Sequence, residues 1–142
     1  MAYCTLDDLL EEIDSSILVE LTDNPTAPTG QIDAEAVASA IRRADSIIDG
    51  YVGVRYAVPL ETVTETIRTV SEDIAVYSLF SRRMIPPKQW ADRYERAVNF
   101  LQAVSEGSAD LGSTADGEKP TAMKNAVYAP NRYWPDDVWE TY

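Results

Sequence analysis

Carboxylates and arginines are the residues of this chain whose types and spacing could do chemistry. The first group is Asp7, Asp8, Glu11 and Glu12, whose spacing of i and i+4 places oxygen ligands together on one helical face. Such a cluster can hold a divalent cation. The same residues are also the polar face opposite a leucine stripe, and the helix dipole favours acids near a helix N-terminus. We therefore assign no metal and no cofactor.

The basic groupings are two arginine pairs, accompanied by Arg93 and Arg96. The pairs are Arg42-Arg43 and Arg82-Arg83. Guanidinium groups on helices bind phosphate, or they pair with carboxylates of the same or an adjacent chain. The second interpretation suits this acidic chain better.

The composition excludes several function classes. The 142 residues include no histidine, which removes Ser-His-Asp and Cys-His nucleophilic machinery and histidine-containing zinc sites. A formal net charge of −12 disfavours general nucleic-acid binding. Cys4 is the single cysteine, so it cannot form an intrachain disulfide. No secretory leader or membrane-spanning segment is expected. These features of the composition favour an intracellular protein that is not an enzyme.

The charge is unevenly distributed along the chain. Residues 1–41 hold nine acids and no base, whereas residues 42–96 hold nine bases and eight acids. Unlike patches on one molecule favour head-to-tail pairing of identical copies. The predicted protomer contacts are therefore the acids of residues 7–12 and the two arginine pairs. The alternative is a plain solvated acidic face.

The elements that must position these residues are helical. Thr5 with Asp8 forms an N-cap signature before a short amphipathic helix, and a separate short piece follows Ser15. Asp33 caps a stripe from Val37 to Tyr51. A capping box of Thr62 and Glu65 opens a mostly buried helix, and the last stripe runs from Pro86-Pro87 to Gly107. The fold class is mainly α, a small bundle of about four helices with an extended aromatic tail.

The chain divides into three regions. Residues 1–106 form the helical domain, residues 107–124 read as a flexible linker, and residues 125–142 form an aromatic tail. Prolines favour an extended tail, which either completes its own core or clamps a neighbour. Its candidate partner-binding residues are Tyr128, Arg132, Tyr133, Trp134, Trp139 and Tyr142.

The order of segments over residues 3–106 resembles a known family. The most specific matches are Ala40-Ile41, Ala44-Asp45, Ile48-Asp49-Gly50-Tyr51, Arg55-Tyr56 and Pro59-Leu60. Further matches are Thr5-Leu6-Asp7-Asp8-Leu9, Leu21-Thr22-Asp23, Gly30-Gln31-Ile32-Asp33, residues 73–79 and residues 93–97. These segments are similar to the head-to-tail adaptor, or neck, proteins of Mu-like tailed bacteriophages.

The resemblance implies a non-enzymatic virion protein, made in the host cytoplasm and located in the neck. It implies a homo-oligomeric ring, dodecameric to match the portal, that binds the portal protein and a downstream neck or tail protein. DNA would pass through its channel only as cargo, and an acidic lining would keep it from sticking. Two alternatives stay open: a small soluble regulatory or anti-host binding module, and a hydrolase working through a carboxylate pair.

Overall fold

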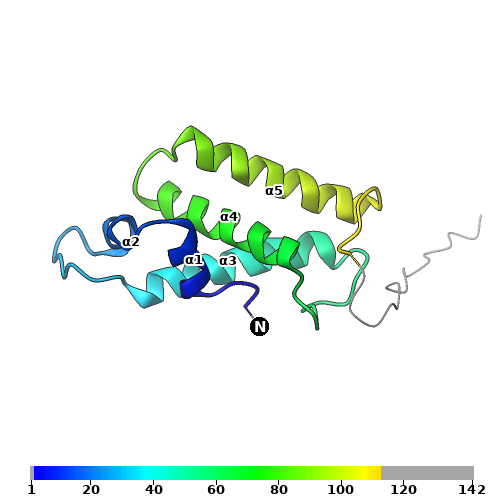
Figure 1. Ribbon diagram of the computed structural model, residues 1–142, viewed down its shortest axis with the longest axis horizontal. Coiled ribbons are helices and arrows are strands. Elements are labelled where there is room, and N and C mark those ends of the chain that lie inside the picture. Colours follow the sequence, from blue (N-terminus) through cyan, green and yellow to red (C-terminus); the bar gives the residue numbers. More distant parts are fainter. Residues whose placement is uncertain (1, 113–142) are drawn as a thin grey trace, which may run out of the picture.

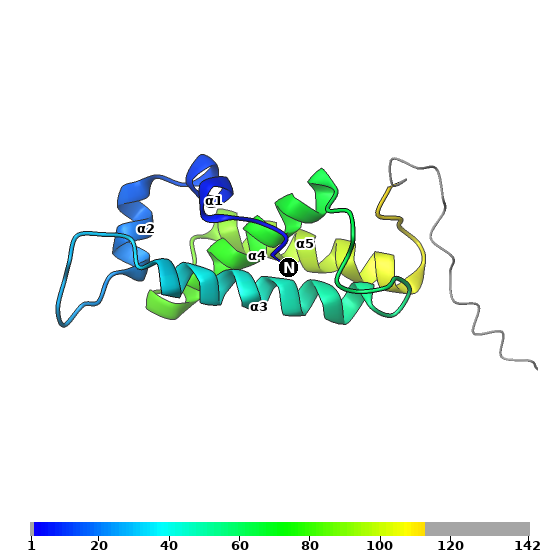
Figure 2. The ribbon, with the colours of Figure 1, turned by 90° about the horizontal axis from the view of Figure 1, so that it is seen from below.

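The computed structural model describes residues 2–112, which fold as a bundle of five α-helices without strands. Three long helices, α3 (Ala34–Val52), α4 (Glu65–Arg83) and α5 (Lys88–Glu106), lie lengthwise side by side (Figure 1). Two short helices, α1 (Leu6–Glu12) and α2 (Ser15–Thr22), cross them toward one end (Figure 2). The predicted helical bundle is confirmed, and residues 6–22 form two helices, which brings the number of helices to five.

The central helix is α4, which contacts each of the other four helices. Its buried positions include Ile67, Ile74 and Leu79, and none of these side chains is more than 1% exposed. Because α4 runs antiparallel to both α3 and α5, its C-terminal turn lies beside the N-terminal half of α3 (Figure 1). This arrangement brings the two arginine pairs toward one another. No helix within residues 2–112 is both long and apolar enough to span a bilayer.

The helix boundaries follow local capping chemistry. Thr5 and Asp8 form the predicted capping box at α1, and the carboxylate of Asp33 accepts hydrogen bonds from two backbone N–H groups at the start of α3. The predicted cap at Thr62 is wrong. The side chain of Thr64 accepts the hydrogen bond from the Ile67 N–H instead, and α4 begins two residues later than expected. Two threonines at this boundary can each supply a capping hydroxyl, so sequence alone does not separate them.

The end of α5 is fixed by glycine. Gly107 has a φ of +87°, and it closes the helix as its C-cap in the left-handed conformation that glycine commonly adopts there. The residues after it pack back onto the loop between α3 and α4. Arg55 Nη1 donates to the carbonyl oxygen of Ala109 at 3.4 Å, the Tyr56 hydroxyl donates to Asp110, and Leu111 is buried. Residues 107–112, the start of the predicted linker, are therefore ordered against the bundle.

Candidate functional site

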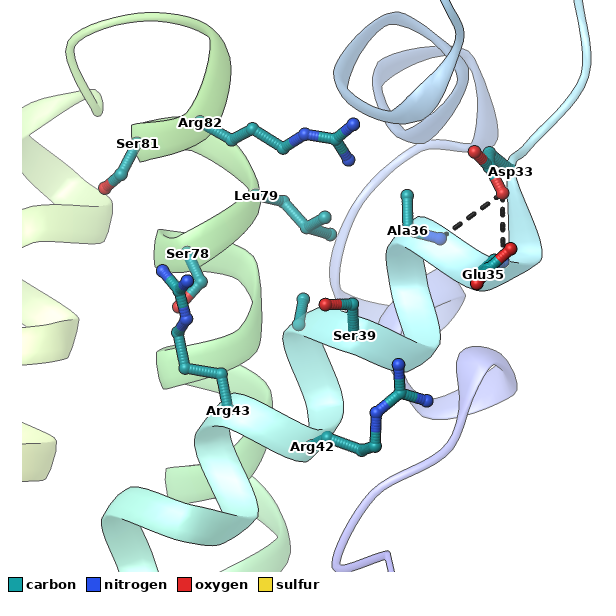
Figure 3. A pocket seen from close by; sticks show the side chains of 11 residues that line it. Asp33, Glu35, Ala36, Ser39, Arg42, Arg43, Ser78, Leu79, Ser81 and Arg82 are labelled. Carbon is teal, nitrogen blue, oxygen red and sulfur yellow. Dashed lines mark hydrogen bonds between the residues drawn. The ribbon is translucent and has the colours of Figure 1, made fainter.

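The two arginine pairs lie along one surface between α3 and α4, which we call the arginine groove and define by Arg42, Arg43, Arg82 and Arg83. A hollow of about 610 Å³ is lined by Arg42, Arg43 and Arg82, with Asp33 at one end. A second hollow of about 410 Å³ is lined by Arg82, Arg83 and the same Asp33. The guanidinium groups of Arg42, Arg43 and Arg82 surround the first hollow (Figure 3). The structure thus brings together four of the predicted protomer-contact residues.

The groove has an apolar floor and a cationic rim. The floor includes Ala36, Ala40 and Leu79, each at most 8% exposed. Within residues 2–112, none of the four groove guanidinium groups makes an ion pair with a carboxylate. Two acids, Asp33 and Glu35, also line the first hollow, and Asp33 already accepts two hydrogen bonds from the first turn of α3. The groove therefore offers unpaired charge-assisted donors to an anionic ligand.

The acidic cluster on α1 is used differently from the prediction. The carboxylate of Asp8 accepts a hydrogen bond from the Thr5 backbone N–H at 2.7 Å, and Glu12 pairs with Arg93. Asp7 and Glu11 are exposed and form no ion pair within the part of the chain that the structure describes. Half of the predicted acidic protomer contacts are thus engaged inside the chain, while Asp7 and Glu11 stay predicted contacts.

A second arginine site joins α1, α4 and α5, and we call it the Arg93 bridge. Arg93 Nη1 lies 2.8 Å from Glu12 Oε2, and Arg93 Nη2 lies 2.7 Å from Asp73 Oδ1. The guanidinium carbon also lies 4.4 Å from the centre of the Trp90 ring, a cation–π contact. This site confirms that an arginine of the later helices pairs with carboxylates of its own chain.

The charges of the bridge are partly desolvated. Burial by itself lowers the pKa of Arg93, but the hydrogen bond to Glu12 and the charge of Asp73 outweigh it, so this pKa is raised. Burial raises the pKa of Asp73 despite the nearby guanidinium. Asp73 is therefore harder to ionise than an exposed aspartate even beside Arg93, and its ionised form depends on that partner.

Glu72 is a buried acid next to this bridge that the sequence analysis missed. Its side chain is 7% exposed, and burial, followed by the negative charges of Glu12 and Asp8, raises its pKa to about 7. The signal that could have found it is the position of Glu72 and Asp73 between Val70 and Ile74, two consecutive positions of the apolar stripe of the central helix. Acids at such positions have to be paired or neutral.

Other predicted features lie partly or wholly outside the described residues. The predicted tail contacts Tyr128, Arg132, Tyr133, Trp134, Trp139 and Tyr142 all fall in residues 113–142, and so do most of the predicted linker and the tail boundary. Within residues 2–112, no group of three or more histidine, cysteine or acidic side chains has the arrangement of a metal site. The groove and the bridge are the sites that the described residues present.

Known proteins match nearly the whole chain, including both arginine sites. Residues 3–129 match the model of the family described as Bacteriophage Mu, Gp36. The chain is 30% identical over 125 residues to the Mu-like prophage FluMu protein gp36 of Haemophilus influenzae, which covers 88% of this chain and 86% of that protein. It is also 30% identical over 112 residues to gene product J of Escherichia phage Mu, covering 79% of this chain and 77% of the relative. The similarity to Mu-like phage proteins that was predicted from the sequence is confirmed. The chain belongs to the bacteriophage Mu gp36 family.

Proposed function

We propose that this protein is a non-enzymatic head-to-tail adaptor that forms a ring between the capsid portal and the next neck or tail component. The observation that carries the proposal is the arginine groove, whose four cations have no carboxylate partner within residues 2–112 of a chain with net charge −12. Unpaired cations on a strongly acidic molecule favour contact between copies, because the groove of one copy attracts the acidic surface of the next. Family membership supports a phage role for this assembly.

A ring follows from the kind of contact that the charges favour. A groove that binds a different surface of an identical copy makes a heterologous interface, and such interfaces close into rings when the rotation allows. In this ring DNA passes through the channel as cargo. The acidic surplus of the chain keeps the phosphate backbone from adhering during passage.

The deciding experiment is quantitative mass spectrometry of purified, DNA-filled particles from the source phage. We expect this chain at a one-to-one ratio to the portal protein, which for a dodecameric portal means twelve copies. Absence of the chain from particles would overturn the adaptor proposal and leave a free regulatory or anti-host binding module as the better account.

The contribution of the groove can be tested in the same particles with a matched pair of variants. Arg82→Glu and Lys88→Glu both reverse one exposed charge, and both lie at the same end of the bundle. Lys88 is outside the groove, and its only ion pair within residues 2–112 is a 3.9 Å contact to Asp92. We expect Arg82→Glu to lower incorporation at least tenfold and Lys88→Glu to leave it within twofold. Equal incorporation of both variants would remove the groove from the assembly interface.

The tail is proposed as a contact to the portal or to a neighbouring subunit. Removing residues 126–142 takes away the aromatic side chains of the kind that dominate protein interfaces. We expect the shortened chain to keep its helical circular dichroism and cooperative melting but to be lost from particles. Loss of cooperative melting would instead mean that the tail completes the core of its own chain.

A further inference from the structure

We infer that the arginine groove binds the acidic aromatic segment of residues 134–142 from a neighbouring copy of this chain. The inference deepens the proposed ring, because it names the surface that fills the groove and rests on the presence of a neighbour.

The Arg93 bridge shows what satisfies an arginine in this protein. Arg93 is held by two carboxylates, those of Glu12 and Asp73, and by the face of Trp90. The groove arginines lack both kinds of partner within the described residues. A ligand that carries carboxylates and aromatic rings close together would supply to the groove what the bridge already has.

Residues 134–142 have this composition. They contain three acids and no base, and one tryptophan precedes the acids while the other lies between the second acid and the third. The acids are Asp136, Asp137 and Glu140, and the tryptophans are Trp134 and Trp139. The rival ligand, the acidic face of α1, offers only Asp7 and Glu11, because Asp8 and Glu12 are engaged inside the chain. The terminal segment therefore matches the groove better in both charge and ring content.

The fold separates the groove from the point where the terminal segment departs. Gly112 follows the C-terminal end of α5, whereas Arg82 and Arg83 lie in the last turn of α4, at the opposite end of the bundle (Figure 1). The 19 residues of α5 make these ends about 28 Å apart. The 21 residues from 113 to 133 reach at most about 70 Å, which covers an adjacent copy as well as the groove of the same chain, and the oligomeric state measured below distinguishes the two. A ligand at one end and its receptor at the other make the heterologous contact that a ring requires.

Subunit mixing tests the inference on the full chain. The tail variant carries Asp136→Asn, Asp137→Asn and Glu140→Gln, and the groove variant carries Arg42→Gln and Arg82→Gln. A control variant removes the same number of exposed acids from α1 and from the N-cap of α2, through Asp7→Asn, Glu11→Gln and Asp14→Asn. Native mass spectrometry and sedimentation measure self-association, and circular dichroism confirms folding.

We expect the wild-type chain to self-associate and the control to stay within twofold of its dissociation constant. The tail and groove variants should each weaken association at least tenfold. A one-to-one mixture of these two variants should form heterodimers and nothing larger, because only one groove and one tail in each pair remain intact. Strong salt dependence of the wild-type association would accompany this result.

Each other outcome overturns the inference and points elsewhere. Loss of association in the control but not in the tail variant would assign the groove to α1 of the neighbour. Two weakened variants whose mixture forms no heterodimer, or a wild-type chain that stays monomeric, would show that no neighbouring tail occupies the groove. Particles that incorporate the tail variant at the wild-type ratio would refute the inference while leaving the proposed adaptor standing.

Discussion

The Arg93 bridge and the arginine groove place the same residue type in opposite situations within one small bundle. Arg93 is 24% exposed in its side chain and contacts two carboxylates and a tryptophan ring. Arg42, Arg43 and Arg82 are exposed and line an open hollow without an ion pair to residues 2–112. The difference indicates that the bridge holds three helices together, while the groove is available for a contact with another molecule.

Burial explains why only one of the two sites matters for stability. A desolvated carboxylate depends on its partner, because removing the partner leaves a charge without compensation. An exposed guanidinium keeps its water and needs no partner in order to fold. Substitutions at the two sites should therefore separate stability from assembly, with the largest effects on stability at the bridge.

The largest effect is expected for Arg93→Ala. This change leaves the buried carboxylate of Asp73 without its cation and removes the packing of the guanidinium on Trp90. We expect a loss of about 3 kcal/mol in the free energy of unfolding, measured by urea denaturation at neutral pH. A loss below about 1 kcal/mol would mean that Asp73 becomes protonated or hydrated at little cost, and the contrast between the two sites would then disappear.

The next effect depends on pH and concerns Glu72 beside the bridge. Its pKa is about 7 in the folded chain and 4.5 as the ordinary value, so the folded state binds the proton more tightly. The stability that this proton contributes is fully present below pH 4.5 and is lost as the pH rises through about 7. Glu72→Gln, which stays neutral, should therefore match the wild-type stability near pH 4.5.

At pH 8 the same variant should be more stable than the wild type by about 2 kcal/mol, a value already reduced for the water that reaches the carboxylate. Urea denaturation of both proteins across this pH range measures the difference. Glu61→Gln is a suitable comparison, because Glu61 is exposed and has no ion pair within residues 2–112. A Glu72→Gln curve parallel to that of the wild type would show that Glu72 is ionised in the fold at all these pH values.

The sequence predicts the helices and their caps better than the partners of the charges. Thr5 and Asp33 cap their helices as predicted, because capping depends on residues within one turn. The N-cap of α4 was predicted at Thr62 but lies at Thr64, because two threonine hydroxyls compete at that boundary. The pairing of Arg93 with Asp73 depends on how α4 and α5 are aligned, and spacing along a single helix carries no such information.

For the same reason, the sequence predicts the arginines of the groove but not that they lie close together. Its arginine pairs are visible in the sequence, and their proximity follows only once α3 and α4 are known to pack antiparallel. The engagement of Glu12 inside the chain was not predictable from the acidic cluster, because that cluster is equally suited to a solvated helix face.

A smaller effect is expected at the outer side of the bridge. Glu12 is 34% exposed in its side chain, so Glu12→Gln removes a partly hydrated ion pair while Arg93 keeps Asp73. The change also removes a negative charge that raises the pKa of Glu72, which offsets part of the loss. We expect a loss of about 1 kcal/mol in the free energy of unfolding at pH 7, measured by urea denaturation. A loss as large as that of Arg93→Ala would show that Glu12 and Asp73 act as a unit.

The smallest effect on stability is expected in the groove, and it is the one that separates the two sites most clearly. Arg43 is exposed on α3, has no ion pair within residues 2–112, and alanine is at least as favourable as arginine inside a helix. Arg43→Ala should therefore change the free energy of unfolding by less than about 0.5 kcal/mol. Thermal and urea unfolding of the isolated chain measure this value. A loss above about 1 kcal/mol would mean that Arg43 is held by a partner in its own chain, and the groove would then resemble the bridge. An unchanged stability together with weakened self-association would show that arginines of one bundle serve folding at one site and assembly at the other.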